Sequence, residues 1–487
     1  MGIVAGLLKR CGYVPARTQR RNMFSPNKQR LYDWVWKGTS ADADIKATLS
    51  KARSISREIC AANPHARKFL NLLAANVIGP SGIGLQVKAS EPNGTPDNLA
   101  NAIIERAWVR GGRVGRYTAD GRLSRAAAQS LIIKAVARDG EVLVRQVRDS
   151  SRPGGYTRQI IESDLLDERR NETRGSNTNE VRMGVEVDAW GRPVAYHLRT
   201  RHPGDGTYDL VETHTERVPA DEILHLYIME RPGQTRGIPW FLPVAERMKM
   251  LAGYAEAELI AARTAAAKMG FFESINPDGY DGEQDVNGNL VLEASPGTME
   301  QLPPGVSFKP WDPQHPTSAY DSFTKSILRE ISAGLGCSYT GLSGDLEGVN
   351  FSSIRQGVLD ERDMWMMLQN WWVDHYERPD FEAWLKMGLL TGDIPLPAAK
   401  YDKFNAPAFQ PRRWSWVDPL KDISAAGYAV ALGVKSRTQI AAEQGSDLDD
   451  VLAEIKAEQE LAASYGVTLQ NPALPNVPQQ QEGAPNA

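Results

Sequence analysis

The stretch FLPVAERMKMLAGYAEAELIAARTAAAKM, residues 241–269, decides the fold class. Its apolar residues recur at spacings of four and three, which is the periodicity of one face of an α-helix. Many of them are small, so a neighbouring helix can approach this face closely. The sequence therefore predicts one long helix over 241–269, whose apolar stripe is Val244, Met248, Leu251, Ala255, Leu259, Ala262 and Ala266.

A second amphipathic helix is predicted over residues 318–336. Between the two helices, residues 270–318 are punctuated by Gly and Pro and contain short predicted strands at 290–292 and 306–308. Two long helices that bracket a small β excursion indicate a projecting stalk. The apolar face of the second helix is Tyr320, Phe323, Ile327, Ile331 and Leu335, and its opposite face carries Asp321, Ser322, Lys325 and Arg329.

The chain before the first long helix alternates helical and strand patterns. Turn clusters separate the strands, and a mostly antiparallel sheet follows from their short, alternating pattern. We therefore expect an α+β domain. The predicted helices span 49–62, 64–78, 97–110 and 123–138, and the predicted strands span 85–87, 141–147, 156–161, 181–187, 194–198 and 223–228.

After the second long helix comes a Gly-rich, acidic loop over 337–350. Helical patterns then follow, and Trp414 and Trp416 alternate as in a strand with a buried face. The tail, residues 467–487, is too polar to pack and is expected to be disordered. The predicted helices of this part span 351–376, 379–390, 420–432, 436–444 and 447–464.

Composition and charge exclude several classes of protein. A chain of 487 residues suggests roughly three domains. Its net charge of −4 disfavours a protein that coats nucleic acid through overall charge. The charge is uneven, however, because residues 1–70 hold 14 basic and 4 acidic residues whereas 446–487 hold 1 basic and 7 acidic. Either the ends are solvated, or they meet different partners.

Cysteine usage and hydropathy set further bounds. Cys11, Cys60 and Cys337 are far apart and form no CxxC pair, which argues against a disulfide scaffold or a zinc ribbon. No targeting signal is recognisable, and no run of about 18 apolar residues is long enough for a membrane-spanning helix.

No pattern points to an enzyme, a cofactor or a metal. The phosphate-binding G-x-x-x-x-G-K-[ST] loop and the G-x-S-x-G elbow are both absent. The acidic run 281–285 starts like a calcium loop, but Val286 and Leu292 stand where that loop needs Gly and Glu. His197 and His202 lack a zinc-site pattern. We therefore expect no catalytic residue, no cofactor and no metal site.

A set of short segments occurs in a characteristic order and spacing. The segments are Asn63-Pro64-His65-Ala66, Asn76-Val77-Ile78-Gly79, Arg138-Asp139-Gly140-Glu141-Val142, Gly184-Val185-Glu186-Val187-Asp188, Gly191-Arg192-Pro193-Val194-Ala195-Tyr196-His197, Val218-Pro219-Ala220, Arg231-Pro232-Gly233-Gln234-Thr235-Arg236-Gly237-Ile238-Pro239, Asn350-Phe351-Ser352-Ser353-Ile354-Arg355 and Val417-Asp418-Pro419-Leu420-Lys421. Together they resemble the lambda family of tailed-bacteriophage portal proteins over about 45–465. Phe351-Ser-Ser-Ile354 departs from the family's Tyr-Ser-Ser-Ala pattern but leaves a helix start intact.

The resemblance implies a homo-oligomeric ring, usually of twelve subunits, at one vertex of the capsid. Double-stranded DNA of any sequence passes through such a ring during packaging and ejection. The implied partners are the large terminase subunit, the major capsid protein with a scaffold or protease, and a head-completion or adaptor protein, with no membrane. The implied location is the virion, and the host cytoplasm during assembly.

The implied portal fold maps onto the predicted elements as follows: a basic N-terminal arm at 1–48, an α/β wing at 49–239, a first stem helix at 240–269, a clip at 270–317, a second stem helix at 318–336, a tunnel loop at 337–350, a wing helix and return strand at 351–419, a helical crown at 420–466 and the tail at 467–487.

Charge placement nominates residues that line the channel. The expected tunnel loop carries Asp345 and Glu347 and no basic residue, so a ring of copies forms a negative collar that keeps phosphates centred. Lys325 and Arg329 on the second stem helix supply a weaker attraction, unless they belong to an ordinary solvated face. Asn350 closes the loop, and we include it in the channel set.

The clip is expected to bind the packaging motor and later the adaptor. Its candidate contacts are Tyr280, Asp281, Glu283, Asp285 and Trp311, although a buried Trp311 is an equal possibility. Two other interpretations stay open at this point: a head-assembly or adaptor protein without a channel, and a nucleic-acid enzyme whose site has no recognisable pattern.

Overall fold

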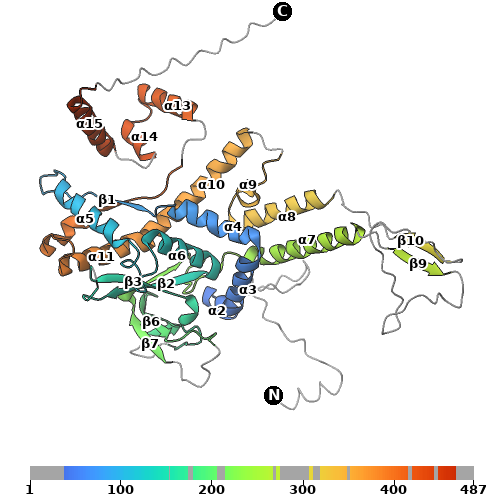
Figure 1. The fold of residues 1–487 in the computed structure, drawn as a ribbon. Coiled ribbons are helices and arrows are strands. Elements are labelled where there is room, and N and C mark those ends of the chain that lie inside the picture. The colour runs from blue at the N-terminus through green and yellow to red at the C-terminus, as the bar shows by residue number, and fades with distance from the viewer. Residues whose placement is uncertain are drawn as a thin grey trace, which may run out of the picture. The chain divides into compact units, whose positions relative to one another are not determined.

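The computed structural model describes residues 38–152, 154–173, 179–205, 214–266, 270–274, 306–310, 319–347, 351–414, 419–443 and 448–467. The chain divides into two compact units (Figure 1). The first comprises Met1–Gly82 with Gln86–Pro407, and the second comprises Ile83–Leu85 with Ala408–Ala487.

Helices open the first unit. The helices predicted at 49–62 and 64–78 are confirmed, whereas α2 lies within the arm predicted at 1–48, where no helix was expected. The break between α3 and α4 is set by Asn63, whose side chain accepts hydrogen bonds from the backbone N–H groups of His65 and Ala66 and so caps α4. Pro64 at the first turn of α4 needs no N–H partner there. The elements are α2 (Ala41–Lys46), α3 (Leu49–Ala62), α4 (Pro64–Leu73), the π-turn η1 (Ala74–Ile78), α5 (Asn98–Gly111) and α6 (Arg125–Asp139).

Two antiparallel sheets confirm the predicted mix of helix and sheet. The first has the order β3-β2-β8, with β2 (Glu141–Arg148), β3 (Tyr156–Ile161) and β8 (Ile223–Tyr227). The second has the order β4-β5-β6-β7, with β4 (Glu180–Arg182), β5 (Val185–Val187), β6 (Pro193–Arg199) and β7 (Thr215–Pro219). The short 3-10 turns η2 (Ser163–Leu165) and η3 (Ala220–Glu222) flank these strands. Buried residues from both sheets, among them Leu143, Val185 and Tyr196, form one cluster.

The second sheet differs from the prediction in two places. The expected single strand 181–187 is the hairpin β4–β5, because Met183 and Gly184 adopt positive φ values of 47° and 86° and reverse the chain. Strand β7 was not predicted. The strand is defined by its pairing with β6. Only Val218 is buried in it, so its sequence lacks the alternation of apolar and polar residues that predicts a strand.

The two predicted long helices are present and lie side by side (Figure 1). They are α7 (Ala245–Ala266), preceded by the 3-10 turn η4 (Leu242–Val244), and α8 (Ala319–Leu335). Arg247 Nε lies 3.0 Å from Glu330 Oε2, and the ring of Tyr254 lies 5.5 Å from that of Tyr320. Strands β9 (Gly270–Ser274) and β10 (Val306–Pro310) form a hairpin ladder between the helices in sequence. The strand predicted at 306–308 is therefore confirmed, whereas 290–292 lies outside the described residues.

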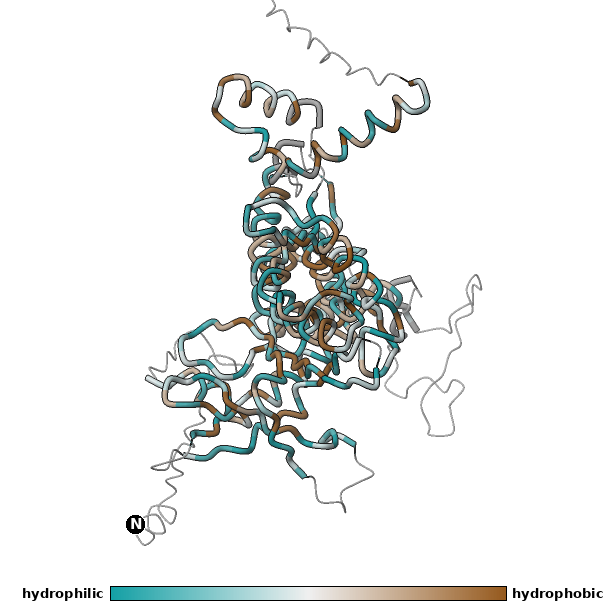
Figure 2. The backbone as a smooth tube through the Cα atoms, turned by 90° about the vertical axis from the view of Figure 1, so that its left-hand side faces the viewer, coloured by the Kyte–Doolittle hydropathy of each residue, from teal (hydrophilic) through white to brown (hydrophobic). Residues whose placement is uncertain are grey.

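A continuous helical rod completes the first unit, although two separate helices were predicted. It consists of α10 (Phe351–Trp372), the π-turn η5 (Val373–Glu377) and α11 (Arg378–Thr391), with Pro379 accommodated at the first turn of α11. Trp365, Trp372 and Phe381 are buried along it. Hydrophobic and hydrophilic residues alternate along the helices, as expected for helices with one buried face (Figure 2). The remaining elements are α9 (Tyr339–Ser343), η6 (Ala398–Lys400) and α12 (Tyr401–Phe404).

The second unit holds three helices among its described residues: α13 (Pro419–Ala431), α14 (Arg437–Glu443) and α15 (Leu448–Ser464). Strand β1 (Gly84–Val87) pairs with β11 (Pro407–Gln410). The strand predicted around Trp414 is wrong, because β11 ends at Gln410 and the half-buried Trp414 has no strand conformation. Trp416 lies outside the described residues.

Candidate functional site

The segment that joins α8 to α10 contains the predicted channel residues. The last turn of α8 ends at Gly336, which adopts a positive φ of 69°. Ser338 then caps α9 by accepting a hydrogen bond from the N–H of Gly341. The predicted loop 337–350 thus contains a five-residue helix, and its remaining described residues run to Glu347.

Lys325 ties the polar face of α8 to this segment. Its Nζ lies 2.8 Å from Asp321 Oδ2, one turn away on α8. It also lies 2.9 Å from Glu347 Oε2 and 3.8 Å from Asp345 Oδ2. One cation therefore faces three carboxylates, two of which come from beyond α9.

Arg329 reaches the same carboxylates through Tyr339. Its guanidinium lies 5.2 Å from the centroid of the Tyr339 ring, within cation–π range. The Tyr339 hydroxyl donates to Asp345 Oδ2 at 2.7 Å, and the N–H of Glu347 donates to Asp345 Oδ1 at 2.9 Å. The segment after α9 is thereby held against α8 by a connected set of polar contacts.

These contacts keep the cluster charged. Hydrogen bonds to Asp321 and Glu347 raise the pKa of Lys325, and the Glu347 N–H and the Tyr339 hydroxyl lower the pKa of Asp345. With two positive and three negative side chains, the cluster carries a net charge of −1. Asp321 and Glu347 are 73% and 79% exposed, so much of its negative charge faces solvent.

The structure thus brings together Lys325, Arg329, Asp345 and Glu347, which the sequence nominated as two opposed sets. Their mutual pairing was not predicted, because nothing in the sequence shows that the segment folds back on α8. Asn350 and the clip candidates Tyr280, Asp281, Glu283, Asp285 and Trp311 lie outside the described residues.

A buried ion-pair cluster lies next to the segment that precedes α7, and the sequence did not predict it. Glu141 at the start of β2 is fully buried, and Arg236 donates to its Oε1 from Nε at 2.8 Å and from Nη2 at 2.5 Å. His225 Nε2 lies 3.0 Å from the other carboxylate oxygen. Although burial raises the pKa of Glu141, Arg236 and His225 hold it well below its usual range.

Two glycines allow the backbone to close over Glu141. The N–H of Gly237 donates to Glu141 Oε2 at 2.9 Å. A Cβ on Gly237 would lie 2.1 Å from the carbonyl oxygen of Gly140, and a Cβ on Gly140 would lie 2.5 Å from the carbonyl carbon of Ile238. Both segments were singled out by family resemblance, and the structure shows that this centre joins the two sheets to the segment that precedes α7.

A second buried centre links the first sheet to the rod. Arg158 on β3 donates to both carboxylate oxygens of Asp380 on α11, at 2.7 and 2.8 Å, and the Tyr156 hydroxyl donates to Oδ1 at 2.9 Å. Nearby, Glu377 Oε1 accepts from Trp372 Nε1 at 2.8 Å and from Gln129 Nε2. Both carboxylates are fully buried.

Glu377 should make stability depend on pH. Burial raises its pKa to about 7, and the hydrogen bond from Trp372 offsets only part of that rise. Between pH 4.5 and 7 the native state therefore binds more protons than the unfolded chain. The protonated Glu377 side chain contributes its full share of the unfolding free energy below about pH 4.5, and this share is lost as the pH rises through 7. Relative to wild type, Glu377→Gln should gain about 3 kcal/mol of unfolding free energy between pH 4.5 and 8.

Urea unfolding at pH 5 and pH 8 measures this difference. Glu172→Gln provides the control, because Glu172 is 54% exposed in its pair with Arg170. Parallel stability curves for wild type and Glu377→Gln would show that Glu377 is charged throughout.

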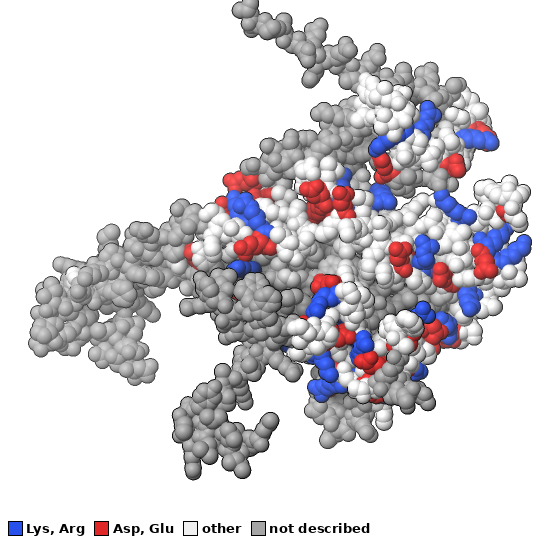
Figure 3. Space-filling view, turned by 180° about the vertical axis from the view of Figure 1, so that it is seen from behind, with Lys and Arg blue, Asp and Glu red and all other residues white. Residues whose placement is uncertain are grey.

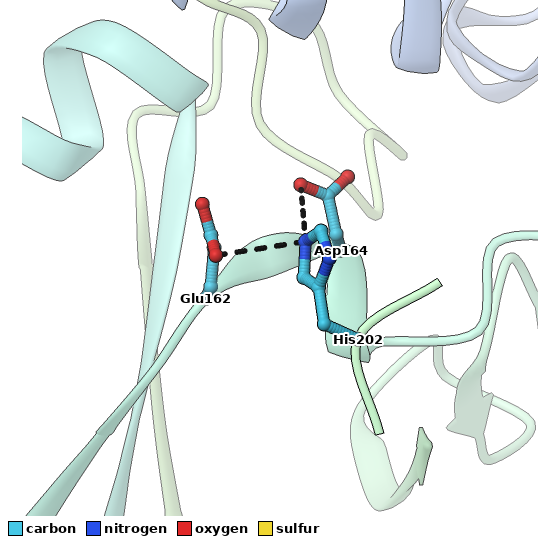
Figure 4. Close-up of side chains that lie close together, drawn as sticks. All are labelled: Glu162, Asp164 and His202. Carbon is cyan, nitrogen blue, oxygen red and sulfur yellow. Dashed lines mark ion pairs between the residues drawn. The ribbon is translucent and has the colours of Figure 1, made fainter. Parts of the chain in front are cut away.

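Glu162, Asp164 and His202 form a cluster that resembles a metal site (Figure 4). His202 Nε2 lies 3.6 Å from Glu162 Oε2 and 3.5 Å from Asp164 Oδ2. However, Arg57 lies 2.8 Å from Glu162 and 2.5 Å from Asp164, and Arg53 lies 3.1 Å from Asp164. Two guanidinium groups already neutralise these carboxylates, which disfavours a bound cation.

Neither positive nor negative side chains dominate the described surface seen in Figure 3. Lys and Arg side chains alternate there with Asp and Glu side chains over the described residues. No helix among the described residues is long and apolar enough to cross a membrane.

Comparison with known proteins gives concordant results. The model of the family "Phage portal protein, lambda family" matches residues 27–369. The probable portal protein of Halomonas phage phiHAP-1 is 37% identical over 455 residues, covering 91% of this chain and 88% of that protein. Portal protein B of Escherichia phage lambda is 22% identical over 358 residues, covering 65% of each chain.

Solved structures of gene transfer agent particles show a distant similarity. The neck of the empty particle is matched with a TM-score of 0.45 at 15% identity, covering 81% of this chain and 93% of that one. The neck of the native particle, computed with C12 symmetry, is matched with a TM-score of 0.42 at 13% identity, with the same coverage.

Proposed function

Because this chain belongs to the lambda family of phage portal proteins, we propose that twelve copies form a ring at one capsid vertex through which double-stranded DNA is packaged and ejected. Helices α7 and α8 would form the stem of each subunit. The segment between them would be the clip, facing out of the capsid, and the α8–α10 connection would be the tunnel loop. The second unit would contribute the crown.

The observation that carries this proposal is apolar surface on the stem. The apolar stripe predicted over 241–269 is buried at Val244, Met248 and Leu251, but Leu259 is 62% exposed. Ile260 is 55% exposed beside it. Phe323 on α8 is 48% exposed. Large apolar side chains exposed on both helices indicate contact with another protein, and neighbouring subunits of a ring would cover them.

The partners follow from this arrangement. The clip would dock the large terminase subunit during packaging and a head-completion or adaptor protein afterwards. The outer parts of the wing would contact the major capsid protein and its scaffold or protease. The ring would reside in the virion after assembly in the host cytoplasm, and we propose that it acts as a conduit without enzymatic activity.

Electron microscopy of the purified protein, with native mass measurement, tests the proposal. The expected particle is a ring with an axial hole wide enough for a DNA duplex, and ATPase and nuclease assays should give no signal. A monomer, or an assembly without a hole, would favour a channel-less adaptor protein instead.

Within the ring, we infer that the Lys325 cluster faces the channel. Its net negative charge would repel phosphates weakly, while the polar contacts hold the tunnel loop in place. Lys325→Ala would add one negative charge per subunit and would also release the loop from α8. The interaction of a unit charge with a phosphate about 10 Å away is weak in water, so packaging should slow by about twofold.

The amount of DNA packaged per prohead in vitro measures this effect. Asp345→Ala combined with Glu347→Ala should change the yield too, since it removes the collar. Lys134→Ala is the matched control, because the Lys134 ammonium donates to the neutral Asn71 side chain at 2.8 Å and forms no ion pair with a described residue. Unchanged packaging by both cluster variants would remove these residues from the channel.

A further inference from the structure

The outer face of α5 and the turn after it carry arginines that the proposed function does not use. Arg106 and Arg110 are spaced i, i+4 and therefore share one face of α5, and Arg113 lies two residues beyond the end of the helix at Gly111. The opposite face is buried through Ala100, Ile104, Ala107 and Trp108. Repulsion between like charges at this spacing costs stability, so the helix itself gains nothing from this face.

The turn brings two more arginines to the same region. The N–H of Gly115 donates to the carbonyl oxygen of Gly121 at 3.1 Å and closes a compact loop. Arg116 and Arg122 flank that closure, and the N–H of Arg116 donates to the carbonyl oxygen of Arg113 at 3.2 Å. We call Arg106, Arg113, Arg116 and Arg122 the α5 arginine patch.

The patch forms no ion pair within the part of the chain that the structure describes. Arg110 pairs with Asp393, whereas the four patch arginines form no ion pair with a described residue. Glu105 accepts from the N–H of Val87, and Asp120 accepts from the Thr118 hydroxyl and the N–H of Arg122. Asp120 also attracts the Arg122 guanidinium, but at a distance beyond that of an ion pair. Arg106, Arg113 and Arg122 are exposed.

The residues that support the patch are held by packed side chains and hydrogen bonds. The Arg125 guanidinium stacks 3.7 Å from the centroid of Trp108 and donates to its carbonyl oxygen. The Tyr117 hydroxyl is hydrogen-bonded to the Tyr376 hydroxyl at 2.8 Å inside the core. The patch therefore presents its charges from a fixed platform, which lowers the entropic cost of binding.

We propose that the α5 arginine patch binds the phosphate backbone of duplex DNA outside the channel. Four guanidinium groups that form no ion pair with a described residue, and no lysine among residues 98–125, suit bidentate contacts to phosphate. Figure 1 shows α5 at the end of the first unit opposite β9 and β10. The inference rests on the proposed function, because with the clip outside the capsid this end faces the compartment that fills with DNA.

Fluorescence anisotropy of the assembled protein with a random-sequence duplex of about 30 base pairs, from 50 to 200 mM salt, tests the assignment. Replacing all four patch arginines with alanine should lower the affinity and reduce the slope of log K against log salt by about 3 to 4. The charge-matched control replaces Arg148, Arg170, Arg182 and Arg217, each of which pairs with a carboxylate, and should leave the slope within about 1 of wild type.

Each outcome decides a separate point. The assignment to this surface is overturned if the slope of log K against log salt is unchanged in the patch variant. It is also overturned if the patch and control variants lose DNA affinity equally. Normal DNA affinity with fewer proheads that contain the protein also overturns it, and indicates instead an acidic protein segment that uses the exposed Val109 and Val114 beside the arginines. A wild-type chain without rings in electron microscopy contradicts the proposed function, whatever the slope.

Discussion

Arg236→Met is expected to lower the free energy of unfolding by about 3–5 kcal/mol, the loss typical of breaking a buried ion pair from one side. Glu141 and Arg236 are both fully buried, so the variant leaves a carboxylate without its principal counter-charge. His225 and the more distant Arg53 Nη1, 3.4 Å away, replace only part of that interaction. Urea unfolding followed by tryptophan fluorescence measures the change.

Two comparisons separate the effect of burial from the loss of an arginine. Arg247→Met removes a pair whose side chains are 54% and 57% exposed, and should cost at most about 1 kcal/mol. Glu141→Leu combined with Arg236→Met should recover part of the loss, because no unpaired charge remains in the core. Equal losses for Arg236→Met and Arg247→Met would mean that the centre is not desolvated as described.

Asp380→Asn should cost a similar amount, about 3–5 kcal/mol, because it leaves the Arg158 guanidinium buried without a counter-charge. Asparagine keeps the shape and one acceptor oxygen, so the measured loss reports the charge more than the packing. The pair is the principal polar link between β3 and α11, and its loss should also loosen the attachment of the rod to the sheet.

Asp393→Asn is the matched control for this experiment. Asp393 pairs with Arg110 at 2.9 Å, but the two side chains are 27% and 42% exposed, so the loss should stay below about 1 kcal/mol. Hydrogen exchange of the β3 amides should rise in Asp380→Asn and stay unchanged in Asp393→Asn. Unchanged protection in both variants would show that the rod is held to the sheet by apolar contacts alone.

The helices were largely predictable because their signals are local. Asn63 and Pro64 mark the break between α3 and α4 within two residues, and the stripe of α7 repeats over its whole length. Strands were harder, because a short strand is defined by its neighbour. Strand β7 exists through pairing with β6, and the turn at Met183 and Gly184 split a run that reads as one strand.

The candidate site was predictable in composition but not in arrangement. Its charges were visible in the sequence, which indicated an acidic loop after a helix with Lys325 and Arg329 on its polar face. Their pairing depends on the return of the segment after α9 to the side of α8. The same holds for the apolar stripe of α7. Its periodicity predicts an apolar face, but it does not show which residues of that face are buried within a single chain.

The sequence by itself determined the class of fold, the two long helices with a β excursion between them, and the membership of a portal protein family. Those features depend on periodicity, caps and segment order, which neighbouring residues encode. The tertiary structure alone decided which charges are buried together: Glu141 meets Arg236 across 95 residues, and Arg158 meets Asp380 across 222. The physical reason is that a charged side chain can be buried only where the fold places a counter-charge beside it. No local sequence pattern specifies such a pair of distant residues.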